Sequence, residues 1–240
     1  MLVISVLLYA SLSAQSFKQL QLKNNRVKTA YQKHWSGLKK EINQLKIDTT
    51  NFFVYLRAFK QEGQLEIWLR SKKEKTYALF KVFPICSSSG ELGPKKKEGD
   101  GQVPEGFYTI SAFNPNSSYH LSLKVNYPNK ADVYLNKPPL GGDIMIHGKC
   151  VTIGCIPIQD DPIEQLYTLC IEAQANGNLI NIDVFPFKFT DKNKLSENLR
   201  NKDQSLIRFW NNLFLCGNFF EKEKQLKPIK INEKGEYYLP

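Results

Sequence analysis

Histidine and cysteine are the side chains in this sequence best suited to nucleophilic chemistry, and there are few of them. The chain has three histidines, at positions 34, 120 and 147, and five cysteines, at positions 86, 150, 155, 170 and 216. A thiol becomes an effective nucleophile when a neighbouring base removes its proton. Any thiol that relies on a histidine base must therefore find it among these three imidazoles.

His147 and Cys155 have the most suitable surroundings. His147 ends a short apolar run, and Cys155 follows Gly154, eight positions after the histidine. An imidazole at the end of a strand can take the thiol proton, and a glycine lets a substrate approach the backbone closely. The backbone amides of Gly154 and Cys155 can donate to a developing oxyanion. We predict that Cys155 is the nucleophile and His147 its general base.

The other histidines and two of the cysteines have simpler interpretations. His34 lies in a polar helical stretch and is expected to be solvated or packed, and His120 is expected to begin an alternating strand as a hydrogen-bonded residue. Cys170 and Cys216 lie in apolar surroundings, which favours buried, inert thiols.

Two alternatives remain open for the segment that contains His147 and Cys155. With Cys150 these residues could form a metal site, although no second His/Cys cluster is present in the sequence to complete a structural one. A Cys150–Cys155 disulfide would instead silence the nucleophile. We predict no metal and no cofactor. Because Cys155 and His147 are assigned the catalytic roles, we expect Cys150→Ser to be tolerated.

The elements that position these residues are mostly strands. Residues 16–45 contain no proline and one glycine, which predicts one or two amphipathic helices. From residue 51 onward, short β-branched and aromatic runs alternate with turn-forming residues, which predicts a β-rich core. The predicted strands are 52–59, 65–69, 77–83, 107–113, 119–125, 143–147 and 179–185, with helices at about 162–175 and 195–223.

Length and composition exclude several protein classes. With 240 residues, of which 42% are hydrophobic, the chain can bury a sizeable core and is not a disordered tail. The net charge of +10 favours anionic partners. The basic run Lys95–Lys97 is followed by Glu98 and Asp100 and is typical of a solvated turn. Because no helix-turn-helix, zinc-finger spacing or aromatic–basic sheet is present, we predict no nucleic-acid binding.

The first fourteen residues predict export. Residues 1–14 form a short apolar run that ends in small residues, as in a signal peptide, although no Lys or Arg precedes Lys18. The first cysteine is Cys86, so lipid attachment to an N-terminal cysteine is not expected. We therefore predict a protein of the periplasm or cell envelope that is peripheral to the membrane at most.

The catalytic motif resembles that of a known family. His147-Gly148 followed by Thr152-Ile153-Gly154-Cys155 is similar to the signature of the L,D-transpeptidase catalytic domain (YkuD type), and most similar to its YafK-like branch. The stretch 99–108 is similar to the family's Pro-x-Gly-x-Tyr/Phe element, and 126–129 and 140–142 also match. The resemblance covers about 51–187.

The resemblance implies a domain organisation. It implies a β-sandwich catalytic domain at 51–187. The residue patterns place a signal peptide at 1–14 and a helical segment at 15–50 before this domain, and a helical extension at 188–240 after it.

The resemblance also implies cysteine acyl transfer on peptidoglycan stem peptides. The Cys155 thiol would attack the amide after the diamino acid to give a thioester, and the Gly148 carbonyl would orient the imidazole of His147. Thr152, Tyr127 and Asn129 are candidate substrate-binding residues. The alternative for Thr152 is a packing role. The alternative for Tyr127 and Asn129 is that they form a turn built on Pro128.

Three departures from the family pattern affect the outcome of the reaction. The loop between the histidine and Gly154 is short, Ile153 stands where many members have a second histidine, and Pro157 stands where many have an arginine. These departures fit the YafK-like branch, so hydrolysis of an L,D-amide, such as the link between murein and a lipoprotein, is the alternative to transpeptidation. A catalytically silent wall-binding protein is the second alternative.

Overall fold

The computed structural model describes residues 17–189 and 202–240. The expected signal peptide at 1–14 lies outside these residues, as do residues 195–201 of the helix expected at 195–223. No helix in the described ranges is both long and apolar enough to span a bilayer.

Eight strands form one continuous, curled sheet, in the order β3-β2-β1-β8-β4-β5-β6-β7. The β1/β8 and β6/β7 pairs are parallel and the other pairs are antiparallel. The mostly-β prediction is therefore confirmed, but the strands do not form two separate sheets, and the expected sandwich is not confirmed. The strands are β1 (Phe52–Phe59), β2 (Gln64–Ser71), β3 (Ala78–Pro84), β4 (Gly106–Asn114), β5 (Ser122–Val125), β6 (Met145–His147), β7 (Ile156–Pro157) and β8 (Asn181–Phe185).

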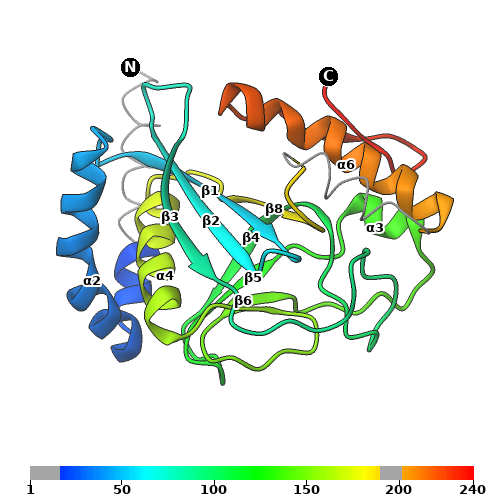
Figure 1. Cartoon of the computed structure of the whole chain (residues 1–240). Coiled ribbons are helices and arrows are strands. Elements are labelled where there is room, and N and C mark those ends of the chain that lie inside the picture. Colours follow the sequence, from blue (N-terminus) through cyan, green and yellow to red (C-terminus); the bar gives the residue numbers. More distant parts are fainter. Residues whose placement is uncertain (1–16, 190–201) are drawn as a thin grey trace, which may run out of the picture.

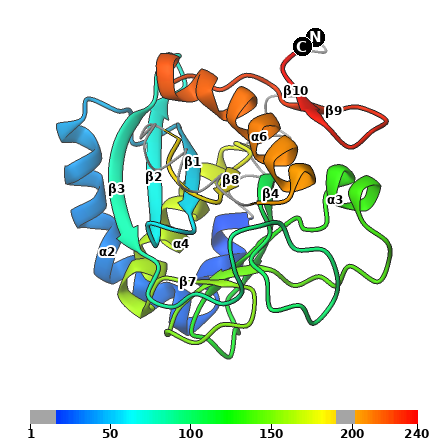
Figure 2. The ribbon, with the colours of Figure 1, turned by 45° about the vertical axis from the view of Figure 1, so that its right-hand side comes forward.

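Helices cover both faces of the sheet near β1 (Figures 1 and 2). α4 (Asp160–Ala175) and α2 (Asn25–Gln44) pack on one face, and α6 (Gln204–Glu223) packs on the other. β1 shows the expected period of two, because Val54 and Leu56 enter the core under α4 while Tyr55 contacts Phe220 of α6 at 4.6 Å between ring centroids. β1 is therefore buried on both faces.

The starts of helices α2 and α4 carry local stabilising signals. The Asn24 side chain caps α2 by accepting hydrogen bonds from the amides of Arg26 and Val27. α4 begins two residues earlier than predicted, with Asp160 and Asp161 in its first turn, where carboxylates favour the positive end of the helix dipole.

The predicted strand at 119–125 is too long. β5 begins at Ser122, and His120 has φ +72° in the preceding turn. The reason is tertiary, since the His120 carbonyl accepts a hydrogen bond from Arg26 and the imidazole lies 2.8 Å from Glu164. Contacts to α2 and α4 therefore hold this turn.

Two helices and a two-stranded hairpin gather at one end of the molecule. α3 (Lys130–Leu135), α6 and the hairpin formed by β9 (Lys230–Ile231) and β10 (Tyr237–Tyr238) lie together at this end of the molecule (Figures 1 and 2). The amide side chain of Asn212 in α6 exchanges hydrogen bonds with the backbone of Tyr237, which fixes the hairpin to the helix.

The curled sheet brings its two edges together at a disulfide. The Cys86 amide, just after edge strand β3, donates a hydrogen bond of 3.0 Å to the Pro157 carbonyl in the opposite edge strand β7. Cys86 is bonded to Cys150. The alternative of a Cys150–Cys155 disulfide is therefore wrong, because sheet closure delivers a partner from 64 positions away that the local spacing does not indicate. Cys155 is a free thiol.

Candidate active site

The sheet register places His147 and Cys155 on one face. Ile146 pairs with Ile156 across the parallel strands β6 and β7, and both side chains are buried in the core. Residues one position away along a strand point to the opposite face. His147 and Cys155 therefore share the other face as diagonal neighbours, and the Met145 amide donates to the Cys155 Sγ at 3.4 Å.

The carbonyl of Gly148 sets the orientation of the imidazole. His147 Nδ1 lies 2.5 Å from the Gly148 oxygen, and because a carbonyl only accepts, Nδ1 carries the proton and Nε2 is left basic. The Tyr119 ring packs against the imidazole, with 4.7 Å between ring centroids. Burial lowers the pKa of His147, and the hydrogen bond to Gly148 partly opposes this effect. The imidazole is therefore neutral, as a base must be.

Glycine at position 148 is required by close approach. A Cβ built there would lie 2.4 Å from Asp160 Oδ1 and 2.9 Å from the Tyr119 carbonyl oxygen. The Gly148 amide donates to the carbonyls of Tyr119 and Leu121, at 3.0 and 3.3 Å. The His-Gly dipeptide thus packs against the turn before β5.

Gly148→Ala is expected to displace the imidazole. The added methyl group has no space beside Asp160 and the Tyr119 carbonyl, so the 147–148 backbone has to shift and the Nδ1 hydrogen bond is disturbed. We expect a kcat roughly 100-fold lower, in the range that misplacement of a catalytic group by about 1 Å produces. Steady-state kinetics checks this, with Gly142→Ala as the matched control because nothing lies within 4 Å of a Cβ at position 142. Equal rates for the two variants would contradict the prediction.

The Cys155 thiol is partly buried and protonated. Burial raises its pKa, the hydrogen bond from the Met145 amide opposes the rise, Asp143 adds to it, and the Lys95 ammonium lowers it. The balance favours the neutral thiol, so for Cys155 to act as a nucleophile a base has to take its proton.

The activity is therefore expected to have an acid limb governed by His147. Because burial lowers the pKa of the imidazole, the basic form is present down to below about pH 6.5, its ordinary value. A pH profile of kcat/KM should rise through a midpoint below about 6.5 and then stay level through neutrality, because the raised pKa of Cys155 keeps the thiol protonated there. An acid limb centred above pH 7 would contradict this assignment.

The expectation of a solvated basic turn is wrong for Lys95. Its side chain is buried, and Nζ donates to Asp100 Oδ1 at 2.6 Å and to the Lys97 carbonyl at 2.9 Å. The Asp100 carboxylate also accepts hydrogen bonds from the amides of Lys96, Lys97 and Gln102, and its pKa falls to about 2. These hydrogen bonds fold residues 95–102 around the Asp100 carboxylate. The Lys95 side chain is thereby turned inward, where its charge acts on Cys155.

A cavity of about 250 Å³ opens beside Cys155. Its walls include Ser87, Ser88 and Ser89 from the segment after β3, and its apolar residues include Ala58 and Val184 from the sheet. The serine segment follows Cys86 directly, so the disulfide joins this wall of the cavity to the loop that leads to Cys155.

Sequence reasoning missed a buried ion pair that supports this cavity. Lys60 lines the cavity and donates to Glu105 Oε1 and to the carbonyls of Gly93 and Val103, at 2.8 to 3.0 Å. Glu105 is fully buried and also accepts from the Gly93 amide and from Trp210 of α6. The sequence signal for this pair is Glu105 itself, the acidic residue inside the Pro-x-Gly element. A carboxylate that is buried there needs a cation as its partner.

Thr152 holds the loop around the nucleophile. Its hydroxyl accepts hydrogen bonds from the amides of Cys155 and Gly154, at 2.8 and 3.2 Å, and donates to the Cys155 carbonyl. Both amides assigned to the oxyanion hole are thus directed at Thr152 Oγ1, and their oxyanion role stays a prediction. Gly154 has φ +131° and sits where a Cβ would be 3.0 Å from the Gln102 carbonyl oxygen, so glycine is needed there as well.

Tyr127 and Asn129 make contacts within the fold. Tyr127 is buried and donates from its hydroxyl to the Leu140 carbonyl at 3.2 Å. Asn129 caps α3 through its side-chain oxygen and donates to the Phe107 carbonyl and the Tyr237 hydroxyl. Neither residue lines the cavity beside Cys155. Their roles in substrate binding stay predictions.

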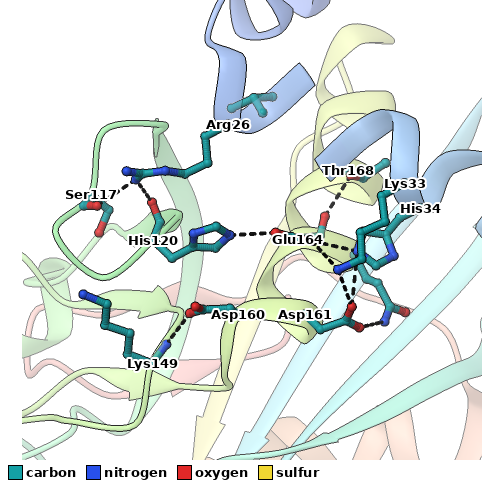
Figure 3. A network of polar contacts seen from close by, with 12 residues as sticks. Arg26, Lys33, His34, Ser117, His120, Lys149, Asp160, Asp161, Glu164 and Thr168 are labelled. Atoms are coloured by element: carbon teal, nitrogen blue, oxygen red, sulfur yellow. Dashed lines mark hydrogen bonds and ion pairs between the residues drawn. The ribbon is translucent and has the colours of Figure 1, made fainter. Parts of the chain in front are cut away.

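The two other histidines converge on one carboxylate (Figure 3). His34 Nε2 lies 2.9 Å from one oxygen of Glu164, and His120 Nε2 lies 2.8 Å from the other. Potential metal ligands of His34, Asp161 and Glu164 lie within 4.8 Å of one another. However, the Lys33 ammonium already pairs with both carboxylates, at 2.8 and 3.0 Å. The network ties α2 and α4 to the turn that carries Tyr119.

Comparison with known proteins identifies the family of this chain. The L,D-transpeptidase catalytic domain (YkuD) model matches residues 54–178. The chain is 30% identical over 189 residues to YafK of Escherichia coli strain K12. The match covers 78% of this chain and 73% of YafK, and a YafK protein of E. coli O157:H7 matches equally.

Solved structures similar to this chain include Pgp2 of Campylobacter jejuni, described as a helical cell shape determining protein. The identity is 19% and the TM-score is 0.46, and the match covers 76% of this chain and 74% of Pgp2. Bd1075 of Bdellovibrio bacteriovorus follows at 20% identity and a TM-score of 0.40, with 71% of this chain and 60% of that chain covered. Neither TM-score reaches 0.5, so the assignment rests on the family model and the YafK proteins. These two matches show that the chain, which carries the His-Gly and Gly-Cys elements, belongs to the L,D-transpeptidase catalytic domain (YkuD) family.

Proposed function

We propose that this protein is a peptidoglycan-modifying cysteine acyltransferase that attacks the stem-peptide amide after the diamino acid. The observation that carries the proposal is the geometry of the pair, since the β6–β7 register puts His147 and Cys155 on one face of the sheet, the Gly148 carbonyl leaves Nε2 of the imidazole as the basic nitrogen, and Cys155 lines a cavity. Family membership supplies the reaction class.

The proposed reaction has two steps. The His147 Nε2 takes the Cys155 proton as Sγ bonds to the amide carbon, and the tetrahedral adduct then expels the leaving amine, which receives that proton from the imidazolium. The product is a thioester on Cys155. An acceptor amine, or water, then adds to the thioester carbonyl while His147 takes its proton, and collapse returns the proton and the electron pair to sulfur.

The proposed compartment is the periplasm or cell envelope. The Cys86–Cys150 disulfide supports it, because disulfides persist in oxidising compartments and are rare in the cytosol. Peptidoglycan stem peptides are the proposed partners, and a murein-linked lipoprotein is the partner in the hydrolytic alternative. Pro157 in place of arginine leaves no guanidinium at that position for an acceptor carboxylate, which favours water as an acceptor.

Product analysis separates these outcomes. The purified protein and its Cys155→Ala form are incubated with sacculi and with defined tetrapeptide muropeptides, and the products are identified by mass spectrometry. New cross-links or exchanged terminal residues that depend on Cys155 would establish a transferase. A shortened stem or a detached protein fragment without cross-links would establish a hydrolase. If no product depends on Cys155, the proposal fails and the silent wall-binding alternative takes its place.

A further inference from the structure

A second cavity, of about 310 Å³, lies away from the catalytic pair. It is formed by the 94–96 segment, α3, α6 and the β9–β10 hairpin, and it shares no lining residue with the cavity beside Cys155. Figures 1 and 2 show α3, α6 and the hairpin gathered at the same end of the molecule. The family model, which matches residues 54–178, does not extend to α6 or to the hairpin.

Most polar side chains around this cavity are used within the protein. Asn212 bonds the backbone of Tyr237 through both ends of its amide. Asn136 donates to the Asp132 carbonyl, and Ser205 bonds to Asp203. The Glu236 carboxylate accepts a hydrogen bond of 2.8 Å from Asn232. These groups build the walls of the cavity.

The buried carboxyl of Asp132 is also satisfied internally. It accepts hydrogen bonds from the Asn129 amide at 2.8 Å and from the Tyr108 hydroxyl at 3.1 Å. Burial raises its pKa to about 7. Part of its negative charge is therefore lost near neutral pH, which reduces the acidity of the cavity.

Three cations remain available. Lys96, Arg208 and Lys234 line the cavity with exposed side chains, and within the described residues none of these side chains makes a hydrogen bond or a contact ion pair. Hydrogen bonds from Ser205 lower the pKa of the Asp203 carboxyl, and the Arg208 charge adds to this at longer range. They come from three separate segments, the 94–96 loop, α6 and the hairpin, which only the tertiary fold brings together. Glu236 is the exposed carboxylate in the same lining, so the three cations outnumber it and together attract a further anion.

One wall of the cavity is apolar. Leu135 of α3 and Leu206 and Phe209 of α6 line it, and Leu135 is 48% exposed. A ligand that fits must therefore place an oxyanion among the cations and an apolar portion against this wall. Binding sites that combine an apolar wall with a few convergent polar groups are typical of small-molecule recognition.

We propose that this cavity binds a small ligand that carries a carboxylate or phosphate group and an apolar portion. The site is separate from the thiol chemistry and does not depend on the proposed function. A free stem-peptide carboxylate and a phosphate group share the chemistry that Lys96, Arg208 and Lys234 recognise, so two probes distinguish them.

The experiment uses the full-length Cys155→Ala protein and nuclear magnetic resonance titrations. The probes are a defined tetrapeptide stem and inorganic phosphate. The reporters are the side-chain amide of Asn212 and the backbone amide of Gly235 for this cavity, and Ser88 for the cavity beside position 155. Binding of either probe should shift the Asn212 and Gly235 resonances. The Arg208→Gln/Lys234→Gln variant should weaken that binding by about tenfold or more, as expected for the loss of charge-assisted hydrogen bonds.

Lys222→Gln is the matched control, because Lys222 is an exposed cation of the same helix that does not line the cavity. Its affinity should stay within about twofold of the parent. The proposal is overturned if neither probe shifts Asn212 or Gly235 at millimolar concentration, or if the double variant binds like the control. A tetrapeptide that shifts Ser88 alone, with phosphate inert, supports the catalytic proposal and overturns this one.

Discussion

Cys155→Ala is expected to abolish Cys155-dependent turnover on muropeptides, and His147→Ala to lower kcat by about 10² to 10⁴, the contribution typical of a general base. Without Sγ no thioester forms, and without the imidazole the thiol keeps its proton, because burial raises its pKa. The two effects should not add, since the pair acts as one unit. Initial rates from quantified muropeptide products measure both.

The structure supplies matched controls for these variants. His34→Ala removes a histidine of α2 that pairs with Glu164 rather than with Cys155, and Cys216→Ala removes a buried free thiol of α6. Both controls should keep most of the activity. Iodoacetamide should label Cys155 selectively, because its thiol is partly accessible whereas the free thiols of Cys170 and Cys216 are buried. Full activity in Cys155→Ala would remove the nucleophile assignment.

Loss of the Cys86–Cys150 disulfide has the second large expected effect. The bond closes a loop across 64 positions, for which the chain-entropy relation gives about 4 kcal/mol of stability. It also joins the serine wall of the cavity to the loop that carries Cys155. Cys150→Ser is therefore expected to lower both the free energy of unfolding and kcat, and this reverses the sequence-based expectation that the substitution is tolerated.

A comparison of three variants tests the disulfide directly. Cys86→Ser, Cys150→Ser and the double variant each break the same bond, so their free energies of unfolding and rates should agree, and their losses should not add. Urea unfolding and muropeptide kinetics measure the two quantities. Reductant should lower the stability of the parent to that of the variants and leave the variants unchanged. Wild-type stability and rate in Cys150→Ser would show that this bond does not hold the loop.

Local sequence patterns determined much of this protein. The period-two runs predicted most strands of the sheet, and helix-favouring stretches predicted helices at the positions of α2 and α4. The same local reading singled out His147 and Cys155, because a strand end and a glycine before the cysteine lie within nine residues. These features depend on neighbours in the chain, so the sequence carries them directly.

The tertiary structure alone decided which distant groups meet. Curling of the sheet brings Cys86 to Cys150, and the same curl gives the cavity its serine wall beside Cys155. Asp100 turns Lys95 inward by gathering three amides, and α6 places Trp210 on the buried Glu105. Partners of charges, thiols and hydroxyls are set by how strands and helices pack over long separations, and periodicity along the chain holds no information about that packing.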